Sequence, residues 1–135
     1  MSKIVGFYDS GIGGLPYLKW LKEHTTGNSF RYLAESRYFP FGTKTEEELK
    51  QIITDSIGRF IEHENPDIIV IACNTASAKA LRTIQQVDLP KIDPRKRVLG
   101  IIRPTAESIG AITQSRHVGV VATPGTIRSH TYEME

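Results

Sequence analysis

A run of six mostly β-branched residues, DIIVIA from Asp67 to Ala72, limits the possible folds of this chain most strongly. Its apolar residues do not alternate with polar ones, which is typical of a strand that is covered on both faces in a parallel sheet. The sequence that follows directly is rich in alanine, so we expect a helix over residues 75–87. The run therefore predicts a buried strand that leads straight into a helix.

Strands and helices are expected to alternate along the chain. Thr45 and Glu48 form a capping-box pair, and apolar residues then recur at helical spacing until Asn65 and Pro66, which predicts the longest helix. Further strands are expected at residues 3–8, 30–34, 98–102 and 118–121, and further helices at 15–24, 104–113 and from about 124 onward. This alternation predicts an α/β fold, a three-layer sandwich in which a mainly parallel sheet lies between helices.

Two units are expected along the chain. The connection over residues 88–97 contains two prolines, and we expect a crossing between domains there. Residues 1–97 are then a first α/β lobe. Residues 98–135 bring a new strand and a short helix, so we expect them to be the beginning of a second lobe that is incomplete here.

Composition and charge exclude several classes of protein. The 135 residues carry a formal net charge of +2 and no long basic block, so no nucleic-acid surface is expected. The single cysteine cannot form an internal disulfide, and the first residues contain no apolar segment of a signal peptide. No apolar run reaches the roughly 18 residues needed to span a bilayer. We therefore expect a cytoplasmic protein that binds neither nucleic acid nor membrane.

Polar residues gather where the predicted strands end. In an open parallel sheet, ligands bind beyond the carboxyl ends of the strands, where loops lead into helix N-termini. Four loops of this chain meet that description, so they are expected to line one crevice. They contribute Asp9 and Ser10, the loop at residues 39–42, the triplet Cys73, Asn74 and Thr75, and the pair Thr123 and Thr126.

Cys73 has two interpretations from the sequence alone. It lies at the predicted N-terminus of a helix, where free N–H groups favour a thiolate that could act in chemistry. Free cysteines are also commonly buried as small apolar residues, and Asn74 and Thr75 could serve only as helix caps. Asp9 is open to the same two interpretations, since Asp followed by Ser and Gly is ordinary turn chemistry.

Four segments in this order, FYDSGIGGL, YFPFGTKT, IACNTASA and GVVATPGTIRS, resemble the cofactor-independent glutamate racemases of the aspartate/glutamate racemase superfamily. The resemblance implies two α/β lobes that hold glutamate between them, with one cysteine on each side of its α-carbon. One thiolate removes the α-proton and the opposite thiol returns a proton, without pyridoxal phosphate or metal. It also implies homodimers and a role in supplying D-glutamate for peptidoglycan.

The resemblance assigns roles to individual residues. Cys73 corresponds to the catalytic acid/base of the first lobe, and Asp9 to an acid near the substrate ammonium that assists the thiol. The remaining matched positions correspond to substrate contacts: Ser10, Pro40, Phe41, Gly42, Asn74, Thr75, Thr123 and Thr126.

Three positions depart from the pattern of the family. Phe41 stands where tyrosine is usual, and Glu35 where aspartate is usual. The second catalytic cysteine has no counterpart, because Cys73 is the only cysteine among the 135 residues. We therefore expect this chain alone to be inactive. The alternatives are a racemase of aspartate or another amino acid, and a non-catalytic fragment that binds a carboxylate.

Overall fold

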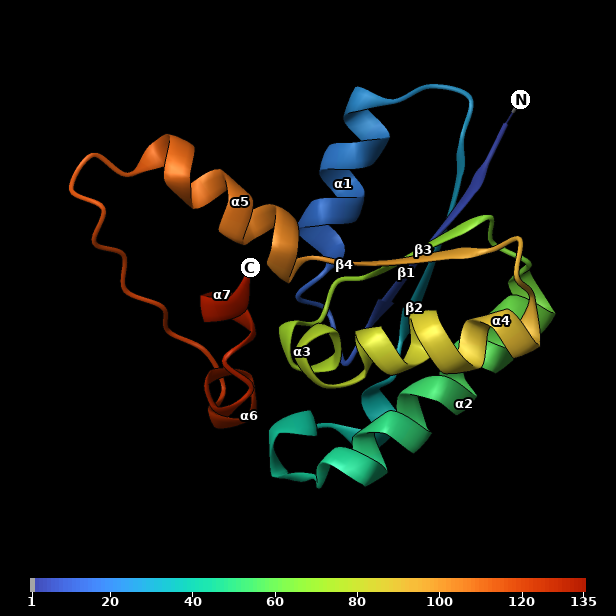
Figure 1. Ribbon diagram of the computed structural model, residues 1–135. Coiled ribbons are helices and arrows are strands. Elements are labelled where there is room, and N and C mark those ends of the chain that lie inside the picture. The colour runs from blue at the N-terminus through green and yellow to red at the C-terminus, as the bar shows by residue number, and fades with distance from the viewer. Residues whose placement is uncertain (1) are drawn as a thin grey trace.

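The sheet is parallel, and the run at 67–72 lies in its interior, as the sequence predicts. The computed structural model describes residues 2–135 (Figure 1). Its four strands are β1 (Ile4–Asp9), β2 (Ser29–Ala34), β3 (Ile68–Ile71) and β4 (Arg97–Gly100), all parallel and in the order β2-β1-β3-β4. The run at 67–72 thus forms β3, a central strand between β1 and β4, which explains why it has no polar face.

Helices cover both faces of the sheet, so the three-layer α/β fold is confirmed. The larger core includes Tyr8, Ile57 and Ile71 and lies on the side of α2 and α3, and the smaller one joins Phe7 to α1 through Leu18. The helices are α1 (Leu15–His24), α2 (Glu46–Glu64), α3 (Asn74–Thr83), α4 (Leu89–Ile92), α5 (Ile102–Ile112), α6 (Pro124–Arg128) and α7 (Thr131–Met134). Short 3-10 turns occur at Ser36–Tyr38 and Phe41–Thr43.

Among residues 2–135, no helix is both long enough and apolar enough to cross a membrane.

Helix α2 begins and ends where the sequence predicts. The hydroxyl of Thr45 accepts a hydrogen bond from the backbone N–H of Glu48, and the Glu48 carboxylate accepts one from the N–H of Thr45. At the other end, Asn65 adopts the left-handed conformation with φ 47° and its N–H donates to the carbonyl of Ile61. Both ends are therefore set by local hydrogen bonds.

Helical structure extends into the connection expected at 88–97, past the predicted end of the helix at residue 87. Helix α3 is followed by a π-helical turn at Ile84–Asp88 and then by α4, so helical structure continues to Ile92. Ile84 and Leu89 are both buried in the larger core, and the N–H of Leu89 donates to the carbonyl of Ile84. Pro90 lies in the first turn of α4, where the N–H that proline lacks is not needed.

The strand expected at 118–121 is wrong. The segment has no regular secondary structure, and its valines are exposed, Val121 completely. A strand requires hydrogen bonds to a neighbour, and within residues 2–135 no strand lies beside this segment. An apolar β-branched sequence is therefore not sufficient here to form a strand.

The predicted boundary between residues 97 and 98 falls inside β4. Val98 is buried in the larger core, and β4 pairs with β3 along its whole length. After β4 the chain leaves the sheet through α5, and the segment drawn in red returns as α6 and α7 near α3 (Figure 1). The division into two lobes itself stays a prediction.

Candidate active site

Asp9 and Cys73 are brought together by the two central strands. Asp9 is the last residue of β1, and Cys73 comes two residues after the end of β3. The strands pair in parallel with Tyr8 opposite Ile71, and the N–H of Ala72 donates to the carbonyl of Tyr8 at 2.8 Å. The loops that follow the two strands therefore start side by side at the carboxyl edge of the sheet.

The thiol of Cys73 lies at the N-terminus of α3. Cys73 is the N-cap residue of this helix, and its Sγ accepts a hydrogen bond from the N–H of Ala76 at 3.5 Å. The thiol also donates to Oγ of Ser10 at 3.5 Å. Only 7% of the residue is exposed, and it belongs to the larger core. The residue is therefore buried while its sulfur faces polar groups, and the role of Cys73 in chemistry stays a prediction.

The carboxylate of Asp9 holds the loop that follows β1. Asp9 is only 4% exposed. Its Oδ1 accepts from the N–H of Ser10 at 2.8 Å, and its Oδ2 accepts from the N–H of Gly14 at 2.9 Å. The hydroxyl of Tyr32 lies 3.0 Å from Oδ2 and is placed to donate to it. These donors fix the loop, and with it the side chain of Ser10 beside Cys73.

Tyr32 is a residue of this site that the sequence did not reveal. Burial, and then the neighbouring carboxylate of Asp9, raise the pKa of Tyr32, so its hydroxyl stays protonated and remains a donor. Tyr32 lies on β2, and only the pairing of β2 with β1 brings it to Asp9. The sequence signal that could have found it is its position in a strand next to the strand that carries Asp9.

Replacing Tyr32 with phenylalanine is expected to destabilise the chain by about 1–3 kcal/mol, because a buried carboxylate loses one of its donors. The free energy of unfolding from urea titration measures the change. Tyr17→Phe is the matched control, because Tyr17 lies on α1 and is 48% exposed. Equal stability of the two variants would contradict the role of Tyr32 in holding Asp9.

Three threonine hydroxyls meet beside the N-terminus of α3. The Oγ1 of Thr75 lies 3.0 Å from that of Thr123 and 3.5 Å from that of Thr126. Thr123 and Thr126 are 3.1 Å apart, and Thr123 also caps α6. Residues separated by about fifty positions in the chain therefore form one hydroxyl cluster, which we call the threonine cluster.

The side chain of Asn74 is held by Tyr132 on α7. The hydroxyl of Tyr132 on α7 donates to Oδ1 of Asn74 at 2.6 Å, and burial raises the pKa of Tyr132. Neither sequence spacing nor periodicity links Tyr132 to α3, so this contact was not predicted. Together with the threonine cluster, it attaches α6 and α7 to the start of α3.

The loop with Pro40, Phe41 and Gly42 also lies near the threonine cluster, and the side chain of Phe41 points into the core. The peptide bond between Phe39 and Pro40 is cis, and the ring of Phe41 is buried in the larger core. A Cβ on Gly42 would lie 3.9 Å from Cβ of Thr123, so the loop borders the threonine cluster. Glu35, the other departure, donates its N–H to the carbonyl of Asp9, while its carboxylate accepts a hydrogen bond from Ser56 on α2.

Comparison with known proteins gives a consistent result. No family model matches the chain. The glutamate racemase of Geobacter metallireducens is 38% identical over 131 residues, which cover 96% of this chain and 46% of that protein. The glutamate racemase of Shouchella clausii is 38% identical over 135 residues, which cover 99% of this chain and 46% of that protein.

The fold leads to the same group of proteins. The glutamate racemase of Aquifex pyrophilus superposes with a TM-score of 0.85 at 29% identity, over 97% of this chain and 49% of its own. That of Francisella tularensis, solved in complex with D-glutamate, has a TM-score of 0.79 at 31% identity, over 98% of this chain and 47% of its own. The chain is therefore similar to the glutamate racemases, and it spans about half the length of the relatives that it matches.

Proposed function

We propose that this chain provides one side of the active site of a glutamate racemase, with Cys73 as the acid/base on that side. The observation that carries the proposal is the position of the Cys73 sulfur, 3.5 Å from Ser10 Oγ and beside the loop held by Asp9. The site lies at the carboxyl ends of the two central strands, where ligands bind in folds of this kind. The names of the relatives supply the substrate.

The sulfur has partners for both states that this reaction needs. As a thiolate, Cys73 takes the α-proton of one enantiomer, so that a C–H bond breaks and an S–H bond forms while the electron pair stays on the substrate. As a thiol, it gives its proton to the carbanion of the other enantiomer. The N–H of Ala76 donates to the sulfur, and Ser10 Oγ accepts from it, so both forms have a hydrogen-bond partner.

The other residues are proposed to bind the amino acid. Asp9 is placed to attract the substrate ammonium, and Ser10 lies between Asp9 and Cys73. Asn74, Thr75, Thr123 and Thr126 surround the N-terminus of α3, whose free N–H groups suit a carboxylate. The backbone of Pro40, Phe41 and Gly42 borders this region. The site as proposed uses no pyridoxal phosphate and no metal.

The proposal extends to the organisation of the complete enzyme. We infer that the first lobe extends through β4 to Gly100, that the residues after β4 start a second lobe, and that the complete protein is a cytoplasmic homodimer. Its product, D-glutamate, is proposed to serve peptidoglycan synthesis. The support is the match to glutamate racemases over nearly the whole chain.

The purified chain is expected to bind glutamate without racemising it, because Cys73 is its only cysteine and one thiol cannot serve both faces of the carbanion. Circular dichroism of L-glutamate incubated with the chain measures racemisation. Amide NMR shifts at Asn74 and Thr75 measure binding, with L-aspartate as the matched ligand. Racemisation that disappears on Cys73→Ala would refute the inactivity, and shifts that favour aspartate would overturn the choice of substrate.

A further inference from the structure

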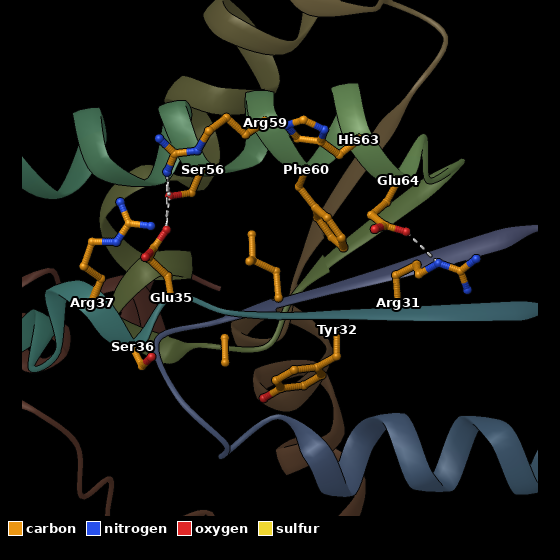
Figure 2. Close-up of a pocket in the computed structure, with 12 residues that line it drawn as sticks. Arg31, Tyr32, Glu35, Ser36, Arg37, Ser56, Arg59, Phe60, His63 and Glu64 are labelled. Carbon is orange, nitrogen blue, oxygen red and sulfur yellow. Dashed lines mark hydrogen bonds and ion pairs between the residues drawn. The ribbon is translucent and has the colours of Figure 1, made fainter.

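A second pocket lies away from Cys73, along the outer strand of the sheet. It has a volume of about 430 Å³ and opens between β2, the turn that follows β2, and α2 (Figure 2). Phe60, of which 6% is exposed, lies in its middle, and charged side chains lie around it. Neither Cys73 nor the threonine cluster lines it, and Tyr32 is the residue that the pocket shares with the candidate active site.

Guanidinium groups are in excess at one end of this pocket. Glu35 is buried there, and its carboxylate accepts from Oγ of Ser56 at 2.6 Å and lies 3.5 Å from Nη2 of Arg59. Arg37 comes from the turn after β2 and lies at the same end (Figure 2), yet no carboxylate in residues 2–135 lies within 4.0 Å of its guanidinium. At the opposite end Arg31 is paired with Glu64 at 2.7 Å. The Arg37 end therefore has a positive charge that an acidic group can neutralise.

The pocket also exposes main-chain hydrogen-bonding groups of β2. The N–H groups of Ser29 and Glu35 donate to residues in and next to β1, so the odd-numbered residues of β2 face β1 and the even-numbered ones face outward. Figure 2 shows the ring of Tyr32 on the opposite side of β2 from Glu35, so Tyr32 borders the pocket with its backbone. No other strand of residues 2–135 pairs with the outer side of β2.

One part of this strand edge is already closed. Nη1 of Arg31 donates to the carbonyl of Phe30 at 3.0 Å, which satisfies the first outward carbonyl of β2. The outward groups of Tyr32 and Ala34 remain, next to Phe60 and followed by Arg37. A free strand edge with an apolar surface and an unpaired cation matches an extended peptide better than it matches a small anion, which would use the cation alone.

We propose that this pocket binds an extended acidic peptide segment of a partner protein, which adds to the sheet beside β2. Its backbone pairs with Tyr32 and Ala34, an apolar side chain rests on Phe60, and an acidic side chain reaches Arg37. This proposal is independent of the racemase reaction, because it uses neither Cys73 nor the threonine cluster.

The experiment is an NMR titration of the ¹⁵N-labelled chain with a blocked peptide of about seven residues that alternates glutamate and valine. The expected result is that the amide signals of Tyr32 and Ala34 shift and that their hydrogen exchange slows. A peptide with lysine in place of glutamate is expected to leave them unchanged. Arg37→Glu is expected to weaken binding at least roughly tenfold, whereas Arg116→Glu, the same change on the remote segment 113–123, leaves it within about twofold.

Three results would overturn the proposal. Equal shifts with inorganic phosphate or free glutamate would make the pocket a small-anion site. Amides of Tyr32 and Ala34 that are protected in the free chain, and more so at higher protein concentration, would show that a second copy occupies the edge. The absence of any shift with about 1 mM acidic peptide would exclude the strand addition outright.

Discussion

Cys73→Ser is expected to lower kcat for glutamate racemisation by about 10²–10⁴-fold, because a hydroxyl is a far weaker acid than a thiol and cannot exchange the α-proton near neutral pH. The measurement needs a form that racemises, and we suggest a chimera in which residues 1–135 are followed by the remaining half of the Geobacter metallireducens relative, which is 38% identical to this chain. Circular dichroism with each enantiomer gives kcat and KM.

The unsubstituted chimera and Ser77→Ala are the controls for this prediction. Ser77 lies one turn further along α3, and its Oγ donates to the carbonyl of Ile71, so the variant changes a buried group of the same helix without touching the sulfur. An activity of Cys73→Ser within tenfold of the unsubstituted chimera would remove Cys73 from the reaction. A comparable loss in Ser77→Ala would show instead that the assay reports the stability of α3.

Gly14→Ala is expected to destabilise the chain by about 1–3 kcal/mol through steric overlap. A Cβ at this position would lie 2.6 Å from Cβ of Ala72 and 3.0 Å from the hydroxyl of Tyr32. Ala72 directly follows the central strand β3 and cannot move away easily, so the loop after β1 must shift. That shift also moves the N–H of Gly14 away from the Asp9 carboxylate that it now contacts at 2.9 Å.

Gly110→Ala is the matched control, because the same methyl group would meet nothing within 4 Å there. Gly110 lies in α5, where alanine is the better helix former, so this variant is expected to gain about 0.5–1 kcal/mol. Urea titration gives both free energies of unfolding. Opposite signs for the two variants support the packing argument, and a neutral Gly14→Ala would contradict it.

The parts of the fold that were predictable depend on local sequence. The unalternating run of β3 and the capping box of α2 each specify their structure within a few residues, and both elements form as expected. The segment 118–121 is also rich in β-branched residues, with three valines beside Gly119, but it lacks a neighbouring strand among residues 2–135. Strand formation depends on that partner as much as on the residues themselves, which explains the wrong prediction.

The placement of Asp9 and Cys73 at one edge of the sheet was predictable, because it follows from the alternation of strands and helices. Parallel strands place their carboxyl ends at one edge, so the alternation of strands and helices is enough to expect that Asp9 and Cys73 meet. Tyr32 and Tyr132 could not be found in this way, because their hydroxyls reach the site from β2 and from α7 through packing. The pocket beside β2 escaped prediction for a similar reason, since the strand order decides which strand is outermost.

The threonine cluster has a consequence for the rate at which a ligand enters. In the free chain the hydroxyls of Thr75, Thr123 and Thr126 form hydrogen bonds with one another. The hydroxyl of Tyr132 donates a hydrogen bond to Oδ1 of Asn74. A carboxylate that binds here must first replace these bonds, which means that α6 and α7 move away from the start of α3. In stopped-flow experiments the observed rate constant of binding is then expected to level off as the ligand concentration rises. The plateau equals the rate at which α6 and α7 separate from the start of α3.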